Sequence, residues 1–185
     1  CGTPYCRQRN LRSPSRNFVG RLIAAKGIFD LLAAMPSILN QMECHLLIAG
    51  DGEERLQVQE YVQRLGLVDH VTLTGYITGE SLAAAYDAAS ILVLPTYFDE
   101  GFPTVLSEAM GAGLPIVTTP IRGAVDYLRD GINTLFVEPH NPDGLAETLS
   151  RLLKDAPLRQ KLAQANLGIL KEFSPEKVAS QYICH

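Results

Sequence analysis

Residues 91–118 read ILVLPTYFDEGFPTVLSEAMGAGLPIVT and contain the elements of a strand–helix–strand unit. Ile91–Leu94 is an apolar run of the length that a buried strand needs. Residues 104–112 are nearly all apolar or small, as in a buried helix, and residues 115–118 form a second short run that is typical of a strand. A strand, a helix and a strand in this order predict two parallel strands joined by a helical crossover.

The same alternation of short apolar runs and helical patterns continues in both directions along the chain. The predicted strands are residues 17–20, 44–49, 71–74, 91–94, 115–118 and 134–137, and the predicted helices are residues 28–39, 53–65, 80–89, 104–112, 123–129, 142–154, 156–171 and 175–183. Strands that are apolar on both faces and separated by helices are typical of a parallel sheet covered on each side. The sequence therefore predicts an α/β fold with a doubly wound, Rossmann-like sheet. Pro36 predicts a kink or a break in the first helix.

The composition is that of a folded globular domain. Of the 185 residues, 46% are hydrophobic and 19% are charged, and the formal net charge is −4. We expect no nucleic-acid partner, because such domains are usually basic. No apolar run approaches the ~18 residues of a membrane-spanning helix. The length fits one ordinary domain or a large half of a two-domain protein.

The cysteines do not follow the spacing of a metal site. They stand at positions 1, 6, 44 and 184, and His45, His70 and His140 are scattered between them. We therefore expect no bound metal, and we expect the thiols to be reduced, as in the cytoplasm.

Residues 1–16 have no periodicity, and we expect them to form a linker or tail ahead of a domain at residues 17–185. They carry four arginines and no acidic residue, so a basic arm that contacts phosphates or a membrane surface is the alternative. The chain begins at Cys1 without a signal-peptide pattern, which we interpret as a fragment of a longer protein.

The segment GRLIAAKG, residues 20–27, places two cations where the first strand ends and a helix begins. Ligands of doubly wound sheets bind beyond the carboxyl ends of the strands. Arg21 can bind an anion as a fork and Lys26 as a point charge, next to the free amides of a helix start. This arrangement suits a diphosphate, although two ordinary surface cations would give the same pattern.

The segment DEGFPTVLSE, residues 99–108, follows the strand at Ile91–Leu94 and opens the next helix. Pro103 suits the first helical turn, and the free amides around it form a second edge for an anion. Glu108 is the only charge in an apolar helix, so we expect a buried carboxylate that binds two neighbouring hydroxyls, such as those of a ribose. Glu100 would then face the group beyond the phosphates. A structural carboxylate and a helix-start anion are the alternatives.

On these segments the chain resembles the C-terminal, donor-binding domain of retaining GT-B glycosyltransferases of family 4, also called group 1. The resemblance runs from Phe18 to about Tyr182. It rests on the Gly-Arg-Leu…Lys-Gly start, the Gly-Asp-Gly turn at 50–52, and two glutamates with seven residues between them. It also rests on AMGAGLP at 109–115 and DGIN at 130–133.

The resemblance implies a role for each matching residue. Arg21 and Lys26 would clamp the diphosphate of a nucleotide-sugar, Glu100 would contact the transferred sugar, and Glu108 would bind the ribose. It makes Glu100, Arg21 and Lys26 the catalytic residues. The donor-binding residues that it implies are Arg21, Lys26, Gly101, Phe102, Pro103, Thr104, Val105, Glu108, Tyr76 and Ile77. The last two would border the nucleobase.

Two departures from the family pattern remove or leave open a role. Pro103 stands where the family commonly has a glycine, so one backbone donor is missing there. Asp126 stands where a glutamate often follows the glycine-rich turn, and we assign it no role.

The resemblance also implies the reaction: transfer of a glycosyl group from a nucleoside diphosphate sugar, with retention and without a metal or another cofactor. The acceptor would be a glycan or a lipid-linked glycan in polysaccharide or glycolipid synthesis. It would bind to an N-terminal domain that this chain lacks, so we expect the chain alone to be almost inactive. We expect the full protein in the cytoplasm, with a peripheral place at the inner face of the membrane.

Other functions fit the sequence less well. A nicotinamide dehydrogenase would need a glycine where Arg55 stands, and there is neither a P-loop nor a Gly-x-Ser-x-Gly nucleophile elbow. Two alternatives remain open. One is a nucleotide-sugar epimerase with the same fold, and the other is a nucleotide-sugar-binding module without catalysis.

Overall fold

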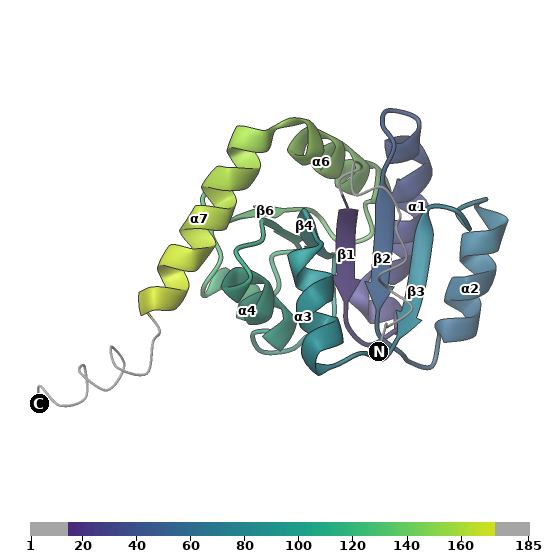
Figure 1. Cartoon of the computed structure of the whole chain (residues 1–185), viewed down its shortest axis with the longest axis horizontal. Coiled ribbons are helices and arrows are strands. Elements are labelled where there is room, and N and C mark those ends of the chain that lie inside the picture. Colours follow the sequence, from purple (N-terminus) through teal and green to yellow (C-terminus); the bar gives the residue numbers. More distant parts are fainter. Residues whose placement is uncertain (1–14, 173–185) are drawn as a thin grey trace, which may run out of the picture.

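The computed structural model describes residues 15–172, which form a six-stranded parallel sheet covered by helices on both faces (Figure 1). The strand order is β3-β2-β1-β4-β5-β6, and every neighbouring pair is parallel. This confirms the predicted doubly wound, Rossmann-like α/β fold. The strands are β1 (Ser15–Val19), β2 (His45–Ala49), β3 (Val71–Gly75), β4 (Ile91–Leu94), β5 (Ile116–Thr118) and β6 (Thr134–Phe136).

The helices connect the strands in the predicted order. They are α1 (Ile28–Leu39), α2 (Arg55–Arg64), α3 (Gly79–Asp87), α4 (Thr104–Gly111), α5 (Arg122–Val125), α6 (Pro142–Lys154) and α7 (Ala156–Glu172), with a short 3₁₀ helix, η2 (Ala24–Lys26). Right-handed crossovers put α1 and α2, which lead outward from β1, on one face. They put α3, which returns the chain from β3 to β4, and α4 on the other face. In Figure 1, α3 and α4 lie in front of the sheet and α1 behind it. Helix α6 packs on α1, and α7 packs on α4.

The core lies on both sides of the two central strands. Ile91–Leu94 is buried along its whole length, and Phe18 is fully buried on the neighbouring strand. Helix α1 runs without a break through Pro36, so the predicted split does not occur. Proline costs this helix one backbone hydrogen bond, while the flanking Met35 and Ile38 are fully buried in the core.

The first strand begins earlier than predicted, at Ser15, so two residues of the expected linker belong to the sheet. Arg16 is fully buried, and its guanidinium interacts with the side chain of Cys44, immediately before the neighbouring β2. Burial lowers the pKa of Arg16. Cys44 is a buried free thiol. The predicted helix at 175–183, the rest of the linker and the other three cysteines lie outside the described residues.

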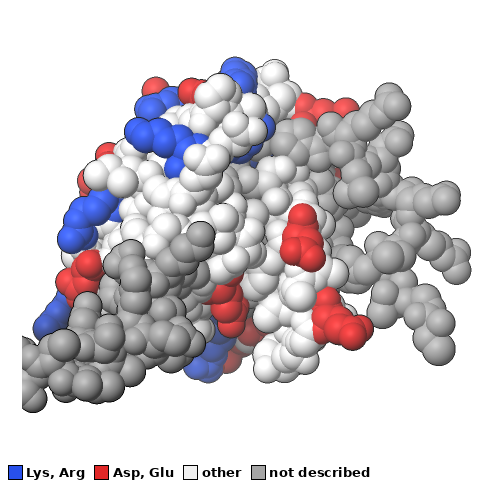
Figure 2. Space-filling view, turned by 60° about the vertical axis from the view of Figure 1, so that its left-hand side comes forward, with Lys and Arg blue, Asp and Glu red and all other residues white. Residues whose placement is uncertain are grey.

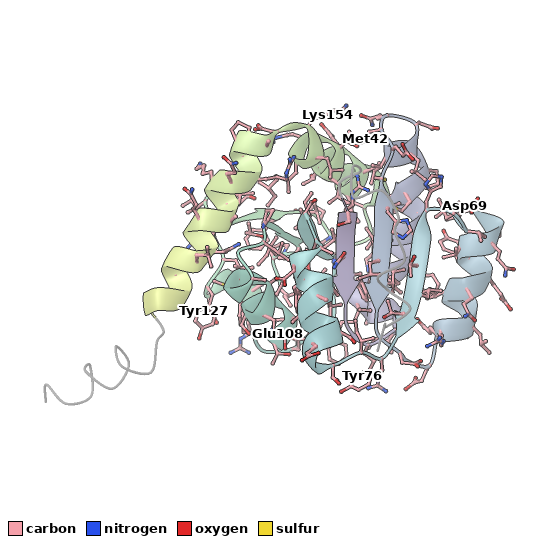
Figure 3. All side chains as sticks on the ribbon, viewed as in Figure 1. Met42, Asp69, Tyr76, Glu108, Tyr127 and Lys154 are labelled. Carbon is pink, nitrogen blue, oxygen red and sulfur yellow. The ribbon has the colours of Figure 1, made fainter. Side chains whose placement is uncertain are left out.

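The sheet order reverses between β1 and β4, and ligands of such folds bind outside the carboxyl ends of the strands at this point. Figure 3 shows the side chains of Tyr76 and Glu108 at this carboxyl edge, whereas Met42 and Lys154 lie at the opposite edge. On the face in Figure 2, basic and acidic side chains are interspersed around a broad uncharged area. Among residues 15–172, no helix has the length and hydrophobicity to cross a bilayer.

Candidate functional site

The loop after β1 is fixed by backbone contacts to both neighbouring loops. Leu22 N–H donates to the Asp51 carbonyl at 2.9 Å, within the predicted Gly-Asp-Gly turn. Tyr97 N–H, after β4, donates to the Ala25 carbonyl at 2.8 Å. Gly27 enters α1 with φ 73°, and a Cβ there would lie 2.0 Å from the carbonyl oxygen of Pro95. The loops after β1, β2 and β4 therefore form one connected surface at the carboxyl edge.

The two predicted cations are each paired with a carboxylate. Arg21 Nη2 lies 2.7 Å from Glu53 Oε1, and both side chains are largely exposed. Lys26 Nζ contacts Glu100 Oε1, in a pair whose side chains are 13% and 25% exposed, and it lies 5.2 Å from the centroid of the Phe98 ring. The structure thus brings Lys26 and Glu100 together from the loops after β1 and β4. Arg21 points to Glu53, on the side of the loop after β2.

The loop of residues 101–103 lies directly on α5. A Cβ at Gly123 would lie 2.2 Å from the carbonyl carbon of Gly101 and 2.5 Å from the amide nitrogen of Phe102. The Phe102 ring also contacts the Tyr127 ring, with centroids 4.8 Å apart. Pro103 is the N-cap of α4, so the amides of the first helical turn follow it, as predicted. The glycine-rich turn at 122–124 therefore supports this loop from behind.

Glu108 is exposed, and the expectation of a buried carboxylate is wrong. Thr104 and Glu108 lie four residues apart on the outer stripe of α4, whereas Leu106, Ala109 and Met110 face the core. An apolar helix can expose one stripe while its other side is buried, and composition alone did not locate that stripe. Glu108 remains near the carboxyl edge, on the face covered by α3 and α4 (Figure 3), and Thr104 is the first residue of α4.

The sequence analysis missed Tyr86, which is the partner of Glu108. Its hydroxyl donates to Glu108 Oε2 at 2.7 Å, and the residue is 6% exposed. Burial raises the pKa of Tyr86, and the hydrogen bond to Glu108 and the charge of that carboxylate raise it further. The available signal was a single tyrosine in the alanine-rich α3, because a buried tyrosine hydroxyl needs a partner.

Tyr76 and Ile77 follow β3, two strands away from β1, at the same edge of the sheet. Tyr76 is 78% exposed, and Ile77 packs partly against the core. Gly50 N–H donates to the Gly75 carbonyl at 2.9 Å, which fixes this loop to the Gly-Asp-Gly turn. Tyr76 is thus presented to solvent beside the loop after β2, which in turn contacts the loop that carries the cations.

A second polar cluster borders η2, where Tyr97 N–H donates to the Ala25 carbonyl. The His140 ring lies 4.1 Å from the Tyr97 ring, centroid to centroid, and its Nδ1 lies 3.8 Å from Asp30 Oδ2. Burial raises the pKa of Tyr97, and the charges of Asp30 and Glu54 add to this shift. Within residues 15–172, no three His, Cys, Asp or Glu side chains are grouped to hold a metal ion.

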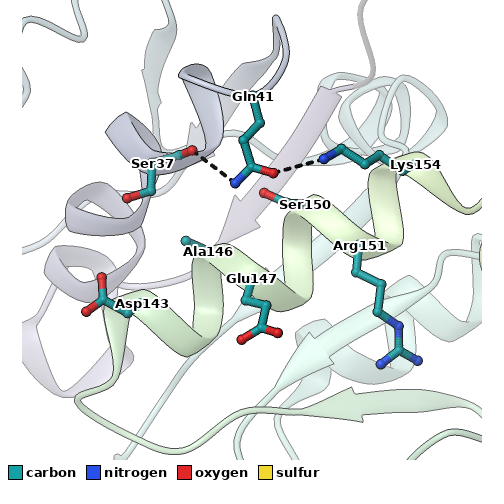
Figure 4. A pocket seen from close by; sticks show the side chains of 8 residues that line it. All are labelled: Ser37, Gln41, Asp143, Ala146, Glu147, Ser150, Arg151 and Lys154. Carbon is teal, nitrogen blue, oxygen red and sulfur yellow. Dashed lines mark hydrogen bonds between the residues drawn. The ribbon is translucent and has the colours of Figure 1, made fainter.

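A groove of about 330 Å³ lies between α1 and α6, away from these loops (Figure 4). The Gln41 side chain bridges it, donating to the Ser37 carbonyl and accepting from Lys154 Nζ at 2.9 Å. None of the predicted site residues lines it. Its lining residues are Ser37, Gln41, Asp143, Ala146, Glu147, Ser150, Arg151 and Lys154.

Known proteins share this fold. The C-terminal domain of a group 1 glycosyl transferase (LpcC) from Francisella tularensis superposes with a TM-score of 0.77 at 23% identity, over 89% of this chain and 87% of that one. HepE from Anabaena, solved with UDP and glucose, superposes with a TM-score of 0.82 at 21% identity, over 92% of this chain and 47% of that one. The described residues therefore have the fold of one domain of these glycosyltransferases.

The sequence comparison defines the family. The chain belongs to the family "Glycosyl transferases group 1", whose model matches residues 10–167. An uncharacterized glycosyltransferase of Methanocaldococcus jannaschii is 33% identical over 167 residues, which are 90% of this chain and 43% of that protein. The chain thus spans less than half the length of this relative and of HepE.

Proposed function

We propose that the chain binds a nucleoside diphosphate sugar at its carboxyl edge and forms the donor half of a retaining glycosyltransferase. The observation that carries the proposal is the meeting of Lys26 and Glu100 at the point where the sheet order reverses. A cation for phosphate and a carboxylate for sugar hydroxyls lie there side by side. Membership of the group 1 family and the likeness to HepE, which was solved with UDP and glucose, support a nucleotide-sugar donor.

Lys26 and Arg21 would balance the charge of the diphosphate, together with the amides of Thr104 and Val105 at the start of α4. In glycosyl transfer, negative charge develops on the departing diphosphate and positive charge on the sugar. Cations and amides at the phosphates would stabilise the leaving group without a metal. The diphosphate would take over Lys26 from Glu100, and Glu100 would then be available to the sugar hydroxyls.

The remaining residues would bind the other parts of the donor. Glu108 lies one turn inside α4 and would accept hydrogen bonds from the ribose, while Tyr76 and Ile77 would border the base. The acceptor, a glycan or lipid-linked glycan, would bind to a further part of the protein. The protein would act in the cytoplasm or at the inner face of the membrane. Without that part, an acceptor oxygen is not held at reacting distance from the anomeric carbon, and transfer is slow.

Titration of the 185-residue chain with UDP, GDP and ADP tests donor binding, and NMR analysis of a product formed with acceptor tests retention. We expect one nucleotide to bind and to raise the melting temperature, with almost no transfer by the chain alone. Transfer by the chain together with the acceptor-binding part of its protein, if unchanged in EDTA, supports a reaction without metal. Rapid transfer by the chain alone would show that the acceptor site is misplaced, and interconversion of the nucleotide-sugar without acceptor would indicate an epimerase.

A further inference from the structure

Tyr86 and Glu108 connect α3 to α4 at the carboxyl edge. The tyrosine is buried in the core up to its hydroxyl, and the glutamate is exposed. The hydroxyl donates to one carboxylate oxygen, Oε2, at 2.7 Å. The described residues provide no second hydrogen bond to this carboxylate. One end of the pair is therefore fixed by packing, and the other end is exposed to solvent.

We propose that Tyr86 is a positioning residue, which holds the Glu108 carboxylate ready for the ribose hydroxyls and thereby favours ribonucleotides over deoxyribonucleotides. The inference rests on the proposed function, because it assigns a role to a neighbour of the residue that would bind the ribose. Tyr86 itself does not need to touch the donor.

The physical basis is the freedom of an exposed glutamate. Such a side chain samples many rotamers and loses this freedom when a ligand binds, which weakens the affinity. Tyr86 restricts the Glu108 side chain before a ligand binds, so less conformational entropy is lost on binding. It can do so because its own ring is held in the hydrophobic core. An ionised carboxylate has about four lone-pair sites, so Glu108 keeps acceptors for a vicinal diol after it has accepted from Tyr86.

In the hydrogen bond between Tyr86 and Glu108, the tyrosine hydroxyl is the donor. Burial and the neighbouring carboxylate raise the pKa of Tyr86 above its usual value. The phenol therefore stays protonated at neutral and mildly alkaline pH and remains the donor to Glu108 Oε2.

The substitution Tyr86→Phe removes the hydroxyl and keeps the ring. The ligands are the tightest binder among UDP, GDP and ADP, and the 2′,3′-dideoxy form of the same nucleotide. We expect Tyr86→Phe to weaken the ribonucleotide about three- to tenfold and to leave the dideoxynucleotide unchanged. Tyr61→Phe on α2, whose ring packs edge-on against Phe29, is the matched control and should change neither.

The ratio of the two affinities is measured within one variant, so a loss of stability does not imitate the effect. Glu108→Gln should lower the same ratio, and adding Tyr86→Phe to Glu108→Gln should lower it little further. An unchanged ratio in Tyr86→Phe would overturn the inference and leave the hydroxyl a structural role alone. If the unaltered chain binds none of the three nucleotides, the proposed function fails, and the inference fails with it.

Discussion

The two loops that border the candidate site present different chemistry. The loop after β1 presents the side chains of Arg21 and Lys26, each paired with a carboxylate. The loop after β4 presents the backbone of residues 101–103, which lies directly on Gly123. Charged side chains can exchange one partner for another, whereas a backbone held from behind has a fixed position. The first loop therefore supplies adaptable charge, and the second supplies fixed geometry.

Removing the two cations of the loop after β1 should have the largest effect on nucleotide affinity. We expect Arg21→Ala with Lys26→Ala to weaken nucleoside diphosphate binding by at least about 100-fold, because charge-assisted bonds contribute roughly 1.5–3 kcal/mol each. The loss is enlarged because Glu53 and Glu100 then remain near the phosphates without their cations. Calorimetric titration measures it, and thermal unfolding checks that the domain still folds. An unchanged affinity would show that the diphosphate binds elsewhere.

Displacing the backbone of residues 101–103 should have the next largest effect on nucleotide affinity. Gly123→Ala adds a Cβ that would lie 2.2 Å from the backbone of Gly101, so the loop has to move. We expect a loss of stability of about 1–3 kcal/mol and about tenfold weaker nucleotide binding. Gly131→Ala is the control for a general glycine effect, since φ is 68° there but a Cβ meets no atom within 4 Å. It should lower stability without changing affinity.

Substitutions of the two glutamates should affect the affinities for different ligands. Glu108→Gln should weaken the free nucleotide and the nucleotide-sugar alike, by about tenfold, because both ligands contain the ribose. Glu100→Gln should leave the affinity for the free nucleotide unchanged. It should reduce the additional affinity that the sugar gives to the nucleotide-sugar. Paired titrations with both ligands measure this difference. Equal losses for both ligands in both variants would show that the roles are assigned wrongly.

Much of the fold and part of the site followed from sequence. The apolar runs located all six strands. The signal is strongest at β4, which is buried on both faces and therefore has little choice of residues, and weaker at the half-buried edge strand β3. The exposed stripe of Glu108 and its partner Tyr86 did not follow, because contacts between α3 and α4 depend on how two helices dock. Arg16 was assigned to a linker by its charge and position, and its burial in β1 runs against the usual preference of arginine for solvent.

The smallest effect should have the opposite sign. Glu53 holds the exposed Arg21, so a diphosphate has to displace this carboxylate before it can use the cation. We expect Glu53→Gln to strengthen nucleotide binding about two- to fivefold, because an exposed ion pair contributes roughly 0–1 kcal/mol. The gain should shrink at high salt, which screens both the pair and the repulsion between Glu53 and phosphate. Glu60→Gln, which removes an exposed charge from the neighbouring α2, is the matched control. Titrations at low and high salt that show the same small change for Glu53→Gln and Glu60→Gln would contradict a partner exchange at Arg21. A gain specific to Glu53 would show that the charged loop, unlike the backbone loop, has to give up a contact in order to bind.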